Sequence, residues 1–261
     1  MEAIIYFFVF VIGTLFGSFF SLAVYRIPIK QSIMHGRSYC PKCNHKLGFW
    51  DLIPIASYIL LGGKCRYCKE KIRGRYIYLE ILSGIVFLLF AMSLKINIYE
   101  LQIQKILYFI FGILFIITLF IIGGIEKENH YISNSVLLFG LIIEAIYIIY
   151  LYTLRFNIYR YIIYLSVMLI LVLINTIILK KKGKESYTIQ ILVLCCYISI
   201  FIREEIFILT ILATFLLVAI NEMMIKSNSC RENILEKNNS IPIGFYLCYV
   251  NILMLILQNL A

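Results

Sequence analysis

Residues 106–125 read ILYFIFGILFIITLFIIGGI, twenty residues without a charged side chain. An α-helix rises 1.5 Å per residue, so a run of this length spans ~30 Å, the thickness of the hydrocarbon core of a bilayer. The whole chain has the same character, because 62% of its 261 residues are hydrophobic and only 15% are charged. Soluble domains carry about 25% charged residues. The composition therefore excludes a soluble globule or a disordered chain and predicts an all-α membrane protein.

Eight apolar runs approach the length that a membrane-spanning helix needs. They are 4–25, 76–94, 106–125, 132–153, 158–179, 187–202, 205–223 and 241–259. The sixth and seventh are short, and only the charged residues 203–205 separate them. We therefore expect a polytopic bundle of about eight transmembrane helices. In this interpretation residues 1–25 are the first transmembrane helix, 26–75 a cytoplasmic loop, and 76–261 a membrane-embedded helical bundle.

The 24 Lys and Arg residues fall unevenly on two sets of loops. The first set contains loop 26–75, with 11 of them, and the regions around 127, 180–184 and 226–237. The second set contains only Lys95, Lys105, Arg155, Arg160 and Arg203. Because Lys and Arg accumulate in cytoplasmic loops, the first set is expected in the cytoplasm. The net charge of +10 then reflects topology, and we expect the lipid bilayer as a partner and no nucleic acid.

Four of the eight cysteines form two CxxC pairs, Cys40–Cys43 and Cys65–Cys68, inside loop 26–75. Two such knuckles can direct four thiolates toward one point, which is the tetrahedral ligand set of a structural Zn²⁺. The alternative, two disulfides, needs an oxidising compartment. Because the loop is expected in the reducing cytoplasm, we predict a closed four-thiolate zinc site that is structural rather than catalytic.

Several segments in fixed order resemble the prepilin peptidases, also called type 4 prepilin leader peptidases. They are GSFFSLAVYRIP at 17–28, SYCPKC at 38–43, WDLIP at 50–54, GKCRYC at 63–68 and RYIYLE at 75–80. The match is dense over residues 13–84, and IPIGF at 241–245 resembles the start of the family's last helix. The middle of the chain matches mainly in hydropathy.

The resemblance implies a multi-pass enzyme of the bacterial cytoplasmic (inner) membrane. Such enzymes are aspartyl-type proteases that cleave the basic leader of type IV prepilin or pseudopilin precursors at the cytoplasmic face. Many of them then methylate the new N-terminus with S-adenosylmethionine. The family's two catalytic aspartates lie at cytoplasmic ends of membrane helices, one in a D…PD-type segment and one in a GxGD-type segment.

Both of these positions differ in this chain. The first aspartate of the family falls on Glu126, and its Pro-Asp pair falls on Ser133-Asn134. The second aspartate falls on Glu185, and Lys184 replaces the preceding glycine. Asp51 is the chain's single aspartate and belongs to the zinc-loop motif, so an Asp–Asp dyad is excluded. Two interpretations stay open: a working Glu126–Glu185 dyad, or a degenerate homologue that binds or methylates pilin-like helices without cleaving them.

Other acidic residues are candidates for binding the substrate. Glu128 would lie beside the basic leader, and Glu80 would either line the site or pair with Arg73 or Arg75. Asp51 would anchor the zinc loop or contact substrate. A buried charge such as Glu144 is also typical of transporters, which is the rival class. A zinc metalloprotease is disfavoured because the sequence contains no HExxH motif.

Overall fold

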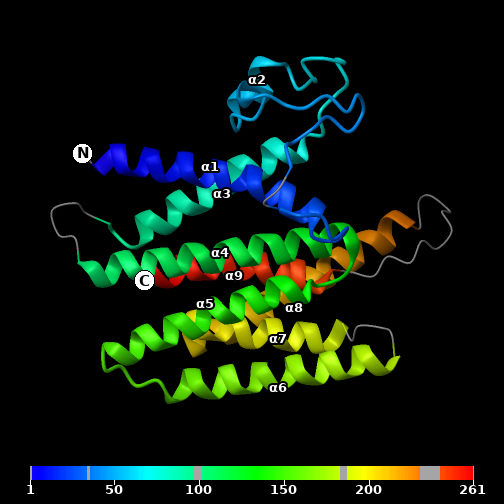
Figure 1. Ribbon diagram of the computed structural model, residues 1–261. Coiled ribbons are helices and arrows are strands. Elements are labelled where there is room, and N and C mark those ends of the chain that lie inside the picture. The colour runs from blue at the N-terminus through cyan, green and yellow to red at the C-terminus, as the bar shows by residue number, and fades with distance from the viewer. Residues whose placement is uncertain (1, 34–35, 97–101, 183–186, 230–241, 261) are drawn as a thin grey trace. The chain divides into compact units, whose positions relative to one another are not determined.

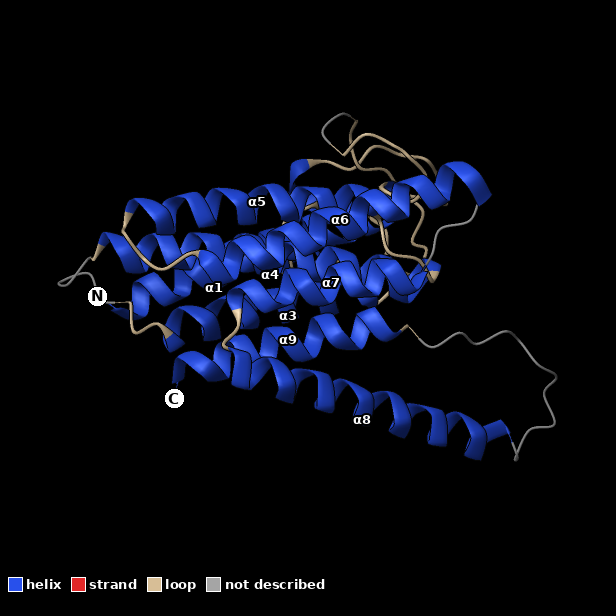
Figure 2. Cartoon of the chain, turned by 90° about the horizontal axis from the view of Figure 1, so that it is seen from below, coloured by secondary structure: helices blue, strands red, loops and turns tan. Residues whose placement is uncertain are grey.

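The computed structural model describes residues 2–33, 36–96, 102–182, 187–229 and 242–260 (Figure 1). Helices make up most of these residues, and the described part of the chain contains no β-strand, only two isolated β-bridges in the cysteine loop (Figure 2). The chain divides into two compact units, Met1–Phe109 and Ile110–Ala261. The predicted all-α fold is therefore confirmed.

The first unit is built on two long helices that pack side by side, α1 (Glu2–Arg26) and α3 (Arg75–Ser93). Small residues let their backbones approach closely. Gly13 lies against Gly84, and a Cβ at Gly17 would lie 2.6 Å from the Cα of Glu80. The Ser83 hydroxyl donates a hydrogen bond of 2.8 Å across the interface to the Gly13 carbonyl. Small residues one turn apart are a common means of packing membrane helices, because lipid provides no hydrophobic force between them.

The segment between these helices contains the four cysteines and two short helices, the 3-10 helix η1 (Phe49–Asp51) and α2 (Ala56–Leu60). Arg26 closes the end of α1 over this segment. Its guanidinium donates to the carbonyl oxygens of Ser32, at 3.0 Å, and Arg37, at 3.5 Å. These bonds explain why a charged side chain is buried at this position.

The second unit contains five complete helices and most of a sixth. Helix α4 (Ile103–Asn129) begins in the first unit and continues through the second, followed by α5 (Asn134–Thr153), α6 (Tyr159–Lys182), α7 (Tyr187–Phe201), α8 (Glu204–Ser229) and α9 (Ile243–Leu260). The core forms around α4 and α7, where Phe115 stacks on Tyr197 and Phe201. The Tyr197 hydroxyl hydrogen-bonds the hydroxyl of Thr118, which satisfies two buried polar groups.

All eight apolar runs form helices. Seven of the helices have the length and composition to cross a membrane, whereas α7 has 15 residues. At 1.5 Å per residue α7 covers ~22 Å, less than the ~30 Å hydrocarbon core. Helices α6 and α8 are mostly exposed, because only 11% and 17% of the residues in their most apolar 18-residue stretches are buried. Apolar side chains on that scale need lipid around them, so this is a multi-pass membrane protein.

Candidate metal centre and buried carboxylate

The four loop cysteines converge on one point. Their sulfur atoms all lie within 4.8 Å of one another, and Cys40 Sγ is 3.8 Å from Cys68 Sγ. A tetrahedral metal with bonds of ~2.3 Å separates its sulfur ligands by about 3.8 Å, whereas a disulfide needs ~2.05 Å. The cysteines are free. Their geometry therefore fits a shared metal ion and does not fit disulfide pairing.

The two CxxC segments have the same backbone conformation. In each, the amide of the first cysteine donates to the carbonyl five residues later, and the amide four residues later donates back to that cysteine. These bonds join Cys40, Asn44 and His45 in the first segment and Cys65, Lys69 and Glu70 in the second. Asn44 and Lys69 both have positive φ, 55° and 59°. Each turn therefore brings its two thiols to the same side of the chain.

The thiols do not titrate alike. The backbone amide of Cys43 donates to Cys40 and lowers the pKa of that thiol to about 7. The Glu70 amide favours the thiolate of Cys68, but desolvation and hydrogen bonds with the other three cysteines raise the pKa of Cys68 to about 11. Four neighbouring thiols cannot all ionise without a compensating positive charge. A divalent metal would supply that charge.

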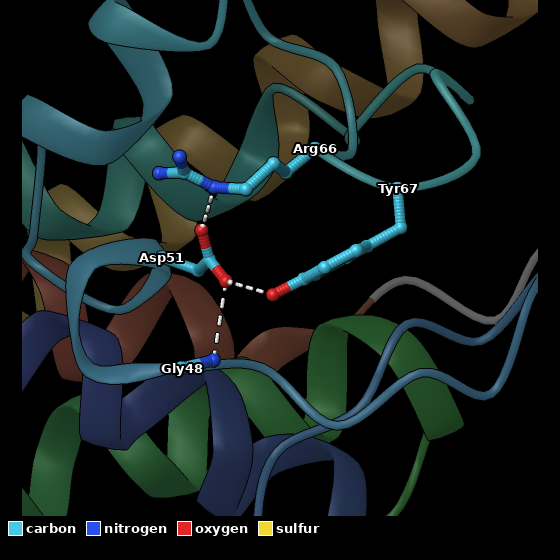
Figure 3. A network of polar contacts seen from close by, with 4 residues as sticks. All are labelled: Gly48, Asp51, Arg66 and Tyr67. Carbon is cyan, nitrogen blue, oxygen red and sulfur yellow. Dashed lines mark hydrogen bonds and ion pairs between the residues drawn. The ribbon is translucent and has the colours of Figure 1, made fainter.

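Asp51 connects the two halves of the loop (Figure 3). Its carboxylate accepts hydrogen bonds from Arg66 Nε at 2.6 Å, the Tyr67 hydroxyl at 3.2 Å and the Gly48 amide at 3.1 Å. Desolvation opposes ionisation of Asp51, but these donors, Arg66 foremost, hold its pKa below the ordinary value. The Tyr67 ring also stacks on His45, with centroids 3.5 Å apart. Asp51 is thus placed as an anchor, one of the two roles predicted for it.

Glu80 fastens the loop to α3. Its carboxylate accepts a hydrogen bond of 2.8 Å from the amide of Ile55, the residue just before α2. Ile55 has a positive φ of 61°, which is strained for a β-branched residue. The sequence predicts that Glu80 pairs with an arginine or lines a substrate site. Its contact with Ile55 has no local sequence signal, because the two residues are 25 positions apart.

In the second unit, Glu126 is fully buried in the last turn of α4. One carboxylate oxygen, Oε1, accepts hydrogen bonds from the Tyr187 hydroxyl and, at 3.0 Å, from the Gly244 amide. The Tyr187 hydroxyl in turn accepts a bond of 3.1 Å from the Ile243 amide. The other oxygen, Oε2, has no partner among the described residues and faces Gly244, where any side chain would collide with it. Three helices, α4, α7 and α9, thus meet at this carboxyl group.

A polar network joins the adjoining helix ends. The Gln190 side-chain amide donates to the Ile132 carbonyl at 2.9 Å and to Asn134 Oδ1 at 3.1 Å. Asn175 also donates to Asn134 Oδ1, at 3.3 Å. Asn134 occupies the position that corresponds to the aspartate of the family's Pro-Asp pair. Its neutral side-chain amide therefore connects α5, α6 and α7.

The remaining candidates are placed as follows. Glu128 is exposed near the end of α4, and Glu185 lies outside the described residues. Glu144 is fully buried in α5, and neither of its oxygens has a hydrogen-bond partner among the described residues. Tyr187 is not among the residues that the sequence predicts for the site. Its only sequence signal is its position two residues after Glu185.

Fold and site together define a polytopic α-helical membrane protein whose loop between the first two membrane-spanning helices carries four cysteines that could bind a metal ion. Residues 11–94, which include α1, the loop and α3, match the Bacterial Peptidase A24 N-terminal domain. This part of the chain is therefore similar to the N-terminal domain of the prepilin peptidases.

Curated relatives match the same part of the chain. A prepilin leader peptidase/N-methyltransferase of Myxococcus xanthus is 41% identical over 80 residues, which are 31% of this chain and 24% of that protein. Its counterpart from Vibrio cholerae is 38% identical over 84 residues, 29% of this chain and 33% of that protein. For the Neisseria gonorrhoeae protein the identity is 35% over 105 residues, 31% of this chain and 37% of that protein. The matches thus cover well under half of each relative. No solved structure matches the chain.

Proposed function

We propose that the protein is a prepilin leader peptidase of the bacterial cytoplasmic membrane. Its substrate would be a type IV pilin-like precursor, cleaved between a basic leader and an apolar helix at the cytoplasmic face. The observation that carries the proposal is the Glu126 carboxyl group, which is fully buried at the end of a membrane helix and held there by two donors. The similarity of residues 11–94 to the Bacterial Peptidase A24 N-terminal domain and the charge distribution of the loops support it.

The proposed chemistry needs two carboxyl groups in opposite protonation states. One carboxylate takes a proton from water while the water oxygen attacks the scissile carbonyl carbon. The second, as a carboxylic acid, gives its proton to the leaving nitrogen as the C–N bond breaks. We assign these roles to Glu126 and Glu185. In Glu126, Oε1 accepts the hydrogen bonds of its donors, and we assign the attacking water to Oε2, which is buried and has no hydrogen-bond partner among the described residues.

The cysteine loop is proposed to hold Zn²⁺ through Cys40, Cys43, Cys65 and Cys68. Four thiolates leave no open position on the metal, so its contribution would be to fix the loop. The names of the relatives also include N-methyltransferase, and we propose methylation of the new N-terminus from S-adenosylmethionine as a second step.

Leader cleavage in proteoliposomes tests the proposal. The purified protein and a prepilin with a basic leader are reconstituted, and release of the leader is followed by mass spectrometry. We expect cleavage in the wild-type protein and its loss in both Glu126→Gln and Glu185→Gln. Glu205→Gln, an exposed glutamate in the first turn of α8, is the control and should cleave normally. Cleavage that persists in either of the first two variants would refute the assignment of that glutamate.

The same reaction tests the second step. With S-adenosylmethionine added, the mature product is expected to gain the mass of one methyl group. An intact precursor that gains this mass instead would identify a non-cleaving methyltransferase and overturn the peptidase proposal.

A further inference from the structure

An apolar patch lies exposed on the cysteine loop. It consists of Phe49, Trp50, Leu52, Ile59 and Leu60, all from η1, α2 and their junction, and we refer to it as the η1–α2 patch. Trp50 is 73% exposed and Leu60 is 85% exposed. Both line one depression of about 490 Å³ together with the salt-bridged Asp51 and Arg66. Large apolar side chains gathered in this way mark a surface that is covered by a partner.

The loop around the patch is strongly basic. Residues 26–75 contain 11 Lys and Arg but only two acidic residues, Asp51 and Glu70. The Asp51 carboxylate is already bound to Arg66 and Tyr67. The exposed basic residues of the second knuckle and its surroundings include Lys64, Arg66 and Lys69. A basic surface with aromatic and aliphatic side chains at its centre is complementary to anionic lipid headgroups.

Contacts within the first unit place the patch near the depth of the membrane surface. Tyr25, at the end of α1, and Tyr78, in the first turn of α3, are exposed, as aromatic residues at a lipid–water boundary commonly are. Glu80, two residues further into α3, holds the Ile55 amide between η1 and α2. Two helical residues correspond to ~3 Å along the axis. The segment that carries the patch is therefore attached to α3 at the level of its boundary tyrosine.

We propose that the η1–α2 patch docks on the bilayer, inserting Trp50 and Leu60 at headgroup depth while the surrounding Lys and Arg bind anionic lipids. The occupant is lipid rather than a prepilin leader, because a basic leader would be repelled by the basic loop. This inference does not depend on the proposed peptidase activity. Docking of the patch gives the loop a membrane contact of its own, in addition to those of helices α1 and α3 at its two ends.

Trp50 is the chain's single tryptophan, so tryptophan fluorescence, excited at a wavelength that tyrosine does not absorb, reports on the patch alone. The protein is reconstituted into vesicles of phosphatidylcholine, with or without phosphatidylglycerol. Quenching is measured with lipids that carry a nitroxide near the headgroup and with acrylamide in the water. We expect the lipid nitroxide to quench Trp50. Acrylamide quenching should fall at least about twofold relative to free N-acetyltryptophanamide, and the protection should be stronger with phosphatidylglycerol.

Two variants calibrate the measurement. The double variant Leu60→Ser, Phe49→Ser weakens the patch and should increase the quenching of Trp50 by acrylamide. An unchanged metal content in this variant shows that the loop is still folded. Trp50→Phe with Phe7→Trp moves the probe to an exposed position of α1 and provides the signal of a lipid-facing residue. Trp50 that is fully open to acrylamide and untouched by the lipid nitroxide would overturn the proposal. Protection that appears only after a prepilin is added would also overturn it, in favour of a protein partner.

Discussion

Gly244 offers the sharpest test of the buried carboxyl group. A Cβ at this position would lie 3.0 Å from Glu126 Cδ and still closer to Oε2. Carbon atoms in contact normally lie ~3.5–4.0 Å apart. Gly244→Ala should therefore push the carboxyl group by about 0.5–1 Å and weaken the bond from the Gly244 amide. Displacements of ~1 Å in a catalytic group can reduce the rate about 10²-fold, so we expect leader cleavage to slow by between about tenfold and a hundredfold.

The assay is the initial rate of leader release in proteoliposomes, with Gly123→Ala as the matched control. A Cβ at Gly123 would lie 3.2 Å from the Tyr249 ring and 3.3 Å from Cys248, so it also stands between α4 and α9 but does not touch Glu126. Glu126→Asp should partly restore cleavage in the Gly244→Ala background, because aspartate is one methylene shorter and withdraws from the new methyl group. A wild-type rate in Gly244→Ala would refute the catalytic role of this carboxyl group.

Three further predictions concern the first unit. Cys40→Ser should reduce the bound zinc measured by elemental analysis to a small fraction of one equivalent, whereas Cys195→Ser should leave it unchanged; full retention in Cys40→Ser would contradict a four-thiolate site. Gly17→Ala should lower the free energy of unfolding by about 1–3 kcal/mol because its methyl group meets the α3 backbone. Thermal unfolding in detergent compares this variant with Leu15→Ala, a substitution at an exposed position. Equal unfolding temperatures in the two variants would disprove the tight packing at Gly17. The pKa of Asp51 is lowered from 3.8, so its contacts with Arg66 and Tyr67 should stabilise the loop at all pH values above about 4 and be lost only at lower pH. Asp51→Asn should therefore speed the release of zinc to a chelator already at neutral pH. An unchanged release rate would show that Asp51 is not an anchor.

The features that the sequence predicted correctly depend on local signals. The long apolar runs specify the helices, and the spacing of Cys40, Cys43, Cys65 and Cys68 specifies the cluster, since each pair is formed by a turn of a few residues. The contacts that were missed join distant parts of the chain. Tyr187 lies 61 residues from Glu126, and Gly244 lies 118 residues from it. No periodicity or motif encodes such pairings, which arise only when α4, α7 and α9 pack together.

In the cysteine loop, the burial of residues cannot be predicted from their hydrophobicity alone. Its exposed Trp50 and Leu60 would be expected in a core if hydrophobicity alone decided burial, but the loop is too small to enclose them. The role predicted for Glu80 was an arginine contact or a substrate contact. The observed acceptor role toward the Ile55 amide depends on a strained backbone that a sequence does not reveal.

The close packing of α1 against α3 has a consequence for how the cysteine loop comes apart. Gly13, Gly17 and Ser83 hold the two helices together through contacts that involve no thiol. Loss of a metal ion held by the four cysteines should therefore open the loop as a separate cooperative unit, while its two ends remain at fixed positions. A loop tethered in this way can recapture an ion without the helices having to reassemble, so demetallation of this protein is expected to be reversible.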